Sequence, residues 1–120
     1  ANINKNIDYV VIGGTFGKSP AIRSLVEELA GRGLAANRLC VLFSCDIKHV
    51  DPDLLNLCAE KKIEVIPNIR INSVSIKSKL LITVDSQVVK FDRLFVAAGV
   101  VPYWSDLSET SAQKSVLSPA

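Results

Sequence analysis

The sequence has no methionine, one histidine and three cysteines, and these shortages narrow the chemistry open to it. One histidine and three scattered cysteines do not make a metal cluster, and the chain shows neither a Ser-His-Asp order nor a pair of catalytic carboxylates. We therefore expect no metal site and no catalytic residue in this chain. The lack of even an initiator methionine predicts a processed chain or an excised piece of a larger protein.

Long apolar runs and a strong charge of either sign are also missing. The apolar runs fall well short of the ~20 residues that cross a bilayer, and no signal-peptide pattern opens the chain. A net charge of +2 is too weak to predict a nucleic-acid or acidic-membrane surface. With 48% hydrophobic and 22% charged residues among 120, the composition is that of one folded domain without nucleic-acid or membrane-spanning function.

The cysteines do not form a pattern that predicts disulfides. An odd number without framework spacing argues against a secreted disulfide scaffold. Cys40 and Cys45 have the C-x4-C spacing of some redox pairs, but side chains five positions apart on a strand point to opposite faces. Buried reduced thiols are the better interpretation. They predict a cytoplasmic, reducing compartment.

The first half of the chain alternates strands with helices. The β-branched run 7–13, IDYVVIG, predicts a central strand that is buried on both faces. Ser19 as N-cap and Pro20 at the first helical position begin a helix. This helix has one apolar stripe, and Gly31 and Gly33 end it. Its buried side is expected to consist of Ala21, Ile22, Leu25, Val26 and Leu29.

A second unit of the same kind follows. Residues 38–44 predict another strand, Asp51 and Pro52 mark a second helix start, and residues 61–67 predict a third strand. Strands that alternate with helices in this way require right-handed crossovers and a parallel sheet.

The remaining segments have a different pattern of apolar and polar residues. Residues 69–76, 79–85 and 87–92 are short and partly alternating, which predicts antiparallel hairpin strands. Residues 93–99 form a solid apolar run that is expected to return to the main sheet. The serine-rich stretch 105–120 lacks periodicity and predicts a mobile tail or linker stub. The predicted fold is α/β, a three-layer Rossmann-like βαβ parallel sheet with an inserted antiparallel β-meander.

Residues 10–20, VVIGGTFGKSP, have the strand, glycine turn and helix start of a dinucleotide-binding loop. Read without a gap, the glycine places of G-x-G-x-x-G hold Gly13, Thr15 and Lys18. In a second register the same places hold Ile12, Gly14 and Gly17, so neither register is complete. The candidate phosphate-binding residues are Gly13, Gly14, Thr15, Phe16, Gly17 and Lys18.

This loop carries features for and against phosphate binding. Thr15 in the second glycine place puts a β-branched side chain where the pyrophosphate approaches the backbone. The amino end of the following helix and the charge of Lys18 favour an anion. The alternative is that the glycines only make a tight turn and Lys18 is solvated.

The order of these segments resembles the pyridine nucleotide-disulfide oxidoreductase family of flavoproteins. The resemblance covers about residues 8–104, from VVIGG through DPDLL and KKIEVIPN to FDRLFVAAGVVP. Asp92, Ala98, Gly99 and Pro102 match the family's ending. The pattern of the DPDLLNLCAEKKIEVIPN segment favours the NAD(P)H-binding domain, preceded by a polar lead-in over 1–7. Asp92, beside Arg93, is interpreted as a structural hydrogen-bonding or ion-pairing residue.

The resemblance implies a cofactor and a partner. It implies a domain that binds NAD or NADP and positions the nicotinamide for hydride transfer to FAD, which a flavin-binding domain or subunit of the same enzyme would hold. The chain alone is then not catalytic. Ala98 and Gly99, at the end of the last apolar run, join the candidate cofactor-binding residues.

The family places an acidic residue at the end of the second strand, where it contacts the ribose hydroxyls of NAD. In this sequence Phe43 or Ser44 stands there, and Asp46 comes late. With Ser44 neutral and Lys48 and His49 near, a 2′-phosphate is tolerated, which favours NADP. Ser44, Asp46 and Lys48 are therefore candidate contacts. The plainer interpretations are a turn residue or helix cap for Asp46 and a surface residue for His49.

Three other functions stay open. The chain is alternatively the FAD-binding copy of the same fold, or a degenerate copy kept as an interaction or structural module. The segment GGTFGKSPAIRSLVEEL also resembles the NAD-binding module of ferredoxin-reductase-type proteins. That module predicts a different sheet order and no β-meander, so residues 69–92 speak against it.

Overall fold

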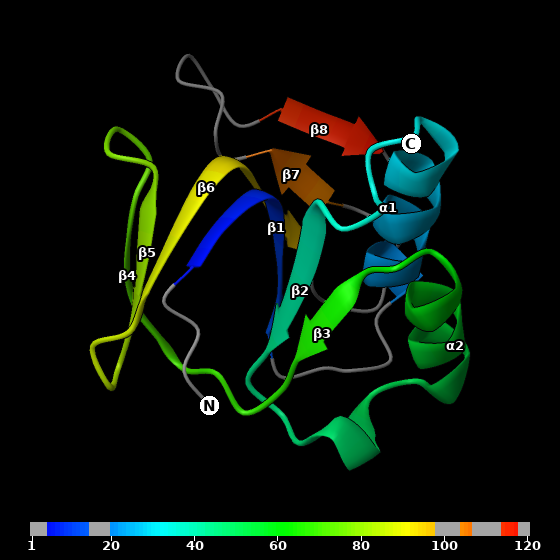
Figure 1. The fold of residues 1–120 in the computed structure, drawn as a ribbon, viewed down its shortest axis with the longest axis horizontal. Helices are drawn as coiled ribbons and strands as arrows, with labels where there is room; N and C mark the ends of the chain where they lie inside the picture. The colour runs from blue at the N-terminus through cyan, green and yellow to red at the C-terminus, as the bar shows by residue number, and fades with distance from the viewer. Residues whose placement is uncertain (1–4, 15–19, 98–103, 107–113, 118–120) are drawn as a thin grey trace.

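The computed structural model describes residues 5–14, 20–97, 104–106 and 114–117 (Figure 1). Within them, eight strands form a single mixed sheet, with two α-helices and a short 3-10 helix, η1, between them. In chain order, the elements are β1 (Lys5–Gly14), α1 (Pro20–Gly31), β2 (Leu39–Phe43), η1 (Ile47–His49), α2 (Pro52–Glu60), β3 (Glu64–Ile66), β4 (Ile71–Ser75), β5 (Leu80–Thr83), β6 (Val88–Ala97), β7 (Trp104–Asp106) and β8 (Lys114–Leu117).

The sheet has a parallel and an antiparallel part. Its main path runs β3-β2-β1-β6-β5-β4. The pairs β3–β2, β2–β1 and β1–β6 are parallel, whereas β6–β5 and β5–β4 are antiparallel. The β-meander therefore extends the parallel strands through β6, and the predicted α/β class with βαβ crossovers is confirmed.

Both helices begin where local signals predict, and α1 also ends where its glycines predict. Asp51 is the N-cap of α2, and its carboxylate accepts a hydrogen bond from the N–H of Asp53 at 3.0 Å. Pro52 then occupies the first helical position. After α1, Gly33 has φ +75° and the N–H of Leu34 donates to the carbonyl of Leu29. This left-handed position favours glycine and closes the helix. The predicted N-cap, Ser19, lies outside the described residues.

The helices cover one face of the parallel strands. All five residues of the predicted stripe of α1 are buried, and they pack against Tyr9 and Val11 of β1, Phe43 of β2 and Phe95 of β6. Leu54 of α2 joins the same core cluster. In Figure 1, α1 and α2 stand together on the right of the sheet, far from the β4–β5 hairpin.

The other face of the parallel strands is covered by the meander. A second core cluster joins Val10 of β1 and Leu42 of β2 to Leu81 of β5 and to Ile69, in the β3–β4 connection. Successive side chains of β1 therefore alternate between the two clusters, with Val10 in one and Val11 in the other. The molecule has the three predicted layers of helices, parallel sheet and meander.

The structure differs from the predicted segmentation at β6. Residues 87–92 and 93–99 were expected to be two strands, but β6 runs without a break from Val88 to Ala97. In its first half only alternate residues, Val89 and Phe91, are buried, whereas Leu94 and Phe95 are buried side by side. The change from alternating to consecutive apolar residues reflects burial of both faces of the strand in its second half, and it does not mark the end of one strand and the start of another.

Two short strands, β7 and β8, follow β6 near the end of the chain. β7 pairs antiparallel with β6, through Ala97 and Trp104, and β8 pairs antiparallel with β7. An edge of β6 beyond β5 offers the backbone partners of β7, which sequence periodicity does not report.

Candidate functional site

The order of the parallel strands makes the end of β1 a topological switch point. From β1 the chain proceeds to β2 and β3 on one side, and later returns to β6 on the other side. In open sheets of this kind, ligands bind outside the carboxyl ends of the strands at such a switch point. Gly13 and Gly14 end β1, and Ala97 ends β6 at the same edge.

The predicted cofactor-binding residues divide into two groups. Those within the described part are Gly13, Gly14, Ser44, Asp46 and Lys48. Those outside the described residues are Thr15, Phe16, Gly17, Lys18, Ala98 and Gly99. Gly14 pairs with Phe43, so the end of β1 meets the end of β2 directly before Ser44.

Gly13 lies where no side chain fits. The register between β1 and β2 shifts from Ile12↔Leu42 to Gly14↔Phe43, so Gly13 is the extra residue of a bulge. A Cβ at this position would lie 2.7 Å from Cε1 of Phe43 and 2.9 Å from Cδ1 of Ile22. Glycine therefore lets β1, β2 and α1 approach closely at the edge where the loop begins.

The end of β2 offers no acidic side chain toward this edge. Phe43 is fully buried in the helix-side core, so it is unavailable to a ligand. Ser44 and Cys45, the next two residues, are half-buried. Of the two positions predicted to face the ribose, the structure leaves Ser44, which is neutral.

Asp46 is the N-cap of η1, which confirms the cap interpretation. Its Oδ1 accepts a hydrogen bond from the N–H of Lys48 at 3.3 Å. The side chains of Lys48 and His49 are exposed on this short helix. The loop after β2 therefore presents one positive side chain, Lys48, and a half-buried carboxylate that is held by the backbone.

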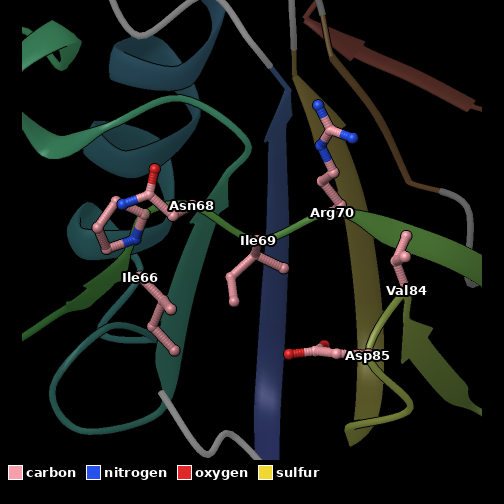
Figure 2. Close-up of a pocket in the computed structure, with 7 residues that line it drawn as sticks. Ile66, Asn68, Ile69, Arg70, Val84 and Asp85 are labelled. Carbon is pink, nitrogen blue, oxygen red and sulfur yellow. The ribbon is translucent and has the colours of Figure 1, made fainter.

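A pocket of about 430 Å³ lies beside the end of β2 (Figure 2). The N–H of Asn68 donates to the carbonyl of Cys45 at 2.9 Å, and the N–H of Ile69 donates to that of Phe43 at 2.8 Å. These bonds fix the β3–β4 connection against the end of β2. The pocket is lined by Ile66, Pro67, Asn68, Ile69, Arg70, Val84 and Asp85.

The far wall of this pocket is the β5–β6 turn. Thr83, a buried polar residue, donates its hydroxyl to Asp85 and accepts the N–H of Gln87 at 3.0 Å. The hydrogen bond from Thr83 is the largest cause of a lowered pKa of the Asp85 carboxyl, which therefore stays ionised. The N–H of Val84 donates to the carbonyl of Arg70 and joins the two walls.

Sequence reasoning did not select the residues of this pocket. The signal available was the polar pair Asn68 and Arg70 inside the apolar stretch IPNIRI, which was interpreted as the start of a hairpin strand. Asn68 has φ +59°, a conformation that asparagine tolerates better than most residues. This turn breaks the extended chain and leads Arg70 to the pocket.

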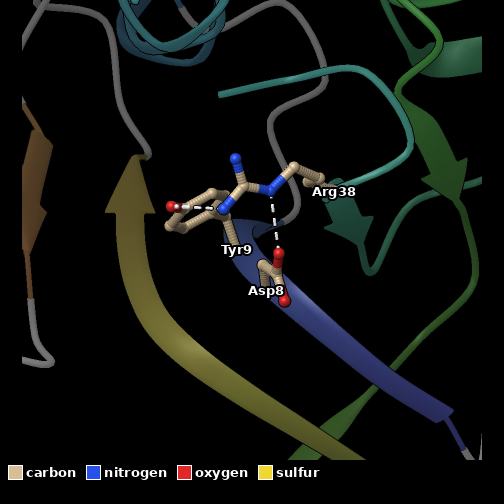
Figure 3. A network of polar contacts seen from close by, with 3 residues as sticks. All are labelled: Asp8, Tyr9 and Arg38. Atoms are coloured by element: carbon tan, nitrogen blue, oxygen red, sulfur yellow. Dashed lines mark hydrogen bonds and ion pairs between the residues drawn. The ribbon is translucent and has the colours of Figure 1, made fainter. Parts of the chain in front are cut away.

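A polar cluster at the opposite edge of the sheet serves the fold. Nε of Arg38 donates to Oδ2 of Asp8 at 2.8 Å and Nη2 donates to the hydroxyl of Tyr9 at 3.2 Å (Figure 3). The guanidinium lies over the Tyr9 ring, 5.1 Å from its centroid. The hydrogen bond to Asp8 raises the pKa of the Arg38 guanidinium above its ordinary value. The cluster joins the start of β2 to β1, away from Gly13 and Gly14.

The remaining candidate groups also have structural surroundings. Asp92 forms an ion pair with Nζ of Lys79 at 3.2 Å, which confirms the ion-pair interpretation. Cys40 is buried in the meander-side core and Cys45 packs against the helix-side core, on opposite faces as predicted. Cys40, Cys45 and Cys58, all in the described part of the chain, form no disulfide. Burial raises the pKa of the Cys58 thiol to about 11.

Metal-binding and membrane-spanning features were also sought. In the described part of the chain, no group of three His, Cys, Asp or Glu side chains is placed to hold a metal ion. None of the helices seen there has the length and apolar character needed to cross a bilayer.

The fold has counterparts among solved structures, although no protein-family model and no curated protein sequence matches the chain. A covalent putidaredoxin reductase–putidaredoxin complex superposes with a TM-score of 0.58 at 17% identity, covering 77% of this chain and 26% of the other. NADH:rubredoxin oxidoreductase from Clostridium acetobutylicum gives 0.58 and 17%, covering 78% and 28%. A pyridine nucleotide-disulfide family oxidoreductase from Enterococcus faecalis V583 gives 0.55 and 15%, covering 76% and 22%.

These likenesses establish the fold. At 15% to 17% identity, a shared fold does not by itself carry a shared activity. The chain spans about a quarter of the length of these oxidoreductases, between 22% and 28%. Its fold therefore matches only one part of each of these structures.

Proposed function

We propose that this chain is the NAD(P)H-binding domain of a flavin-dependent oxidoreductase. The observation that carries the proposal is the close approach at Gly13, where β1, β2 and α1 meet at the switch point of the sheet. A dinucleotide site of this class needs such an approach, because the backbone that follows must reach the pyrophosphate. The solved oxidoreductases that share the fold support the same proposal.

Each part of the edge then has a role toward the dinucleotide. The loop from Gly13 to Lys18 would hold the pyrophosphate, with the amino end of the twelve-residue helix α1 behind it. Ser44, Asp46 and Lys48 would face the adenosine ribose, and Ala98 and Gly99 would border the nicotinamide. The bound nicotinamide supplies hydride chemistry, and this chain binds and orients it.

The rest of the enzyme lies outside this chain in the proposal. FAD would be held by a flavin-binding domain or subunit, which would receive the hydride, and the assembly would work in a reducing, cytoplasmic compartment. Two of the similar structures are a covalent complex of putidaredoxin reductase with putidaredoxin and an NADH:rubredoxin oxidoreductase. The proposal for this chain extends to the dinucleotide and the flavin domain only.

One observation favours a second candidate, a degenerate copy of the same fold that acts as a structural or interaction module. The residue at the end of β2 is the buried Phe43 and not an exposed acid, so the usual ribose contact of NAD sites is missing. An FAD-binding copy is the other alternative. The three differ in which ligand stabilises the folded chain.

The proposal is tested by thermal unfolding with NADH, NADPH, FAD and ADP-ribose. A ligand that binds only the folded state raises the melting temperature. At a hundredfold excess over Kd it adds about 2.7 kcal/mol to the free energy of unfolding. NADH or NADPH, together with ADP-ribose, should raise it. Stabilisation by FAD alone would instead support the FAD-binding copy, and no shift with any of the four would support the degenerate module.

A pair of charge reversals locates the effect. Lys18→Glu places a negative charge in the proposed pyrophosphate loop, so it should weaken the stabilisation by every dinucleotide. Lys77→Glu makes the same change in the β4–β5 turn, outside the candidate site, and should leave the stabilisation intact. Equal effects of the two variants would contradict the placement of the pyrophosphate.

A further inference from the structure

The pocket beside the end of β2 contains a cation that the fold does not use. The guanidinium of Arg70 takes part in none of the ion pairs or side-chain hydrogen bonds found among the described residues, and the residue is exposed at the pocket. Its carbonyl, in contrast, accepts the N–H of Val84. The backbone of Arg70 is therefore fixed while its charged end is available to a ligand.

Hydrogen bonds fix the two residues before Arg70 against the end of β2, where the adenosine is proposed to lie. Asn68 and Ile69 bond to the carbonyls of Cys45 and Phe43, the two residues that flank Ser44. Arg70 is the next residue along the same segment and lines the pocket with Asn68 (Figure 2). At the place where an acid would bind two free ribose hydroxyls, Phe43 is buried and Ser44 is neutral, and the nearby carboxylate of Asp46 accepts a hydrogen bond as the N-cap of η1.

The presence of an arginine and the lack of an acid at the end of β2 bear on whether the site prefers NAD or NADP. An acidic residue at this place accepts the ribose 2′-hydroxyl of NAD and repels a phosphate, whereas an arginine nearby accommodates the 2′-phosphate of NADP. A guanidinium is also the side chain best shaped for a phosphate, because it donates two parallel N–H bonds. A neutral Ser44 at the end of β2, together with an Arg70 that forms no ion pair among the described residues, matches the second arrangement.

The pocket also carries one opposing charge. Asp85 lines the wall opposite Arg70, and its hydrogen bonds from Thr83 and Gln87 hold it in the β5–β6 turn. A negative charge here weakens the attraction of a phosphate. Removal of that charge should therefore strengthen phosphate binding, which gives a second, independent variant.

We propose that Arg70 contacts the 2′-phosphate of NADP(H) and makes the site selective for NADP(H) over NAD(H). This inference rests on the proposed function, because it assigns the adenosine end of the same site. Arg70 is then a specificity-determining residue with no part in the hydride transfer. Ile66, Ile69 and Val84 line the same pocket.

The test compares two probes that differ only in the 2′-phosphate, 2′,5′-ADP and 5′-ADP, by isothermal titration calorimetry on the full chain. The wild type should bind 2′,5′-ADP about tenfold or more tightly than 5′-ADP, the size expected for a charge-assisted pair of hydrogen bonds. Arg70→Gln should abolish this preference and leave 5′-ADP within about twofold. Lys77→Gln, which removes one positive charge from a distant turn, should keep the preference.

A second variant tests the sign of the electrostatic argument. Asp85→Asn should bind 2′,5′-ADP more tightly than the wild type and leave 5′-ADP unchanged. Circular dichroism and the melting temperature check that each variant is folded. Arg70→Gln removes no side-chain contact seen in the described part of the chain, so it should keep the wild-type fold.

The outcomes separate this inference from the proposed function. Binding of 5′-ADP with no preference for the 2′-phosphate, or an equal loss of both probes in Arg70→Gln, overturns the role of Arg70 and leaves the dinucleotide site standing. Absence of binding of either probe to the wild type overturns both. A loss confined to 2′,5′-ADP in Arg70→Gln supports the inference.

Discussion

The backbone of Gly13 lies against the ring of Phe43, so closely that a single added carbon would come within 2.7 Å of Cε1. The two residues belong to neighbouring parallel strands and sit beside a bulge at the end of β1. Cδ1 of Ile22, in α1, closes the third side at 2.9 Å. The glycine of the loop and the phenylalanine at the end of β2 are therefore one packing unit, which shapes the edge where the cofactor is proposed to bind.

Gly13→Ala should destabilise the fold. Neither an aromatic ring in a fully buried position nor the end of Ile22 can move away without disturbing the core, and overpacking of this kind costs about 1–3 kcal/mol. Urea unfolding measures the change in free energy. The double variant Gly13→Ala with Phe43→Leu should recover part of the loss, and strict additivity of the two substitutions would contradict the packing unit.

A matched glycine provides the control for that experiment. Gly31, at the end of α1, is exposed and would have nothing within 4 Å of an added Cβ. Gly31→Ala should leave stability unchanged or raise it by up to about 1 kcal/mol, through the lower entropy of the unfolded chain. Equal destabilisation by both alanines would show that the contact with Phe43 is not the cause.

The stability of the chain should fall between pH 9 and pH 11 in part because of Cys58. Burial raises the pKa of its thiol from an ordinary value near 9 to about 11. Between these values the unfolded state releases the proton and the folded state keeps it, so rising pH favours unfolding. Unfolding free energies measured from pH 8 to pH 11 should fall less steeply in Cys58→Ala than in the wild type. Parallel curves would contradict a buried neutral thiol.

The β5–β6 turn should depend on pH through Asp85. The hydrogen bond from Thr83 lowers the pKa of the Asp85 carboxyl, so this interaction stabilises the fold above the ordinary carboxyl pKa and is lost as pH falls through the lowered value. Thr83→Val, which keeps the size of the side chain, should raise the pKa of Asp85 toward its ordinary value. Carboxyl-detected NMR titration measures it, and an unchanged value in Thr83→Val would count against the hydrogen bond.

Substitutions in the Asp8–Tyr9–Arg38 cluster should distinguish the contribution of the ion pair from that of the stacking on the ring. Arg38 both pairs with Asp8 and lies over the ring of Tyr9. Asp8→Asn should lower the urea midpoint at low salt but not in 1 M salt, because an exposed ion pair is screened. Arg38→Lys should lower it at both salt concentrations, because lysine lacks the planar group that stacks on an aromatic ring. Arg32→Lys, in the exposed pair with Glu28, is the control and should change the midpoint less.

Local signals in the sequence predicted much of the fold. The five-residue stripe of α1, the cap formed by Asp51 and the parallel strands follow from spacing, side-chain oxygens at helix starts and β-branched runs, all of which act over a few residues. The continuity of β6 was missed. Its two halves differ in texture because one face of the first half is exposed, which depends on neighbours that periodicity does not reveal.

The candidate site was less accessible to prediction. The glycine motif identified the end of β1, and a helix cap was one of the two plain interpretations of Asp46, which the structure confirms. The pocket with Arg70 depends on two hydrogen bonds from Asn68 and Ile69 to residues more than twenty positions earlier. No local pattern encodes such long-range pairing, and only the folded chain brings Arg70 to the end of β2.

The central claim is that the carboxyl edge around Gly13 and Ser44 holds a dinucleotide. The most direct measurement is a titration of the isotopically labelled chain with ADP-ribose, followed by amide chemical shifts. The account predicts saturable shifts concentrated in residues 13–22 and 44–49. Shifts that stay absent at millimolar ligand, or that gather at the opposite edge around Arg38, would contradict it.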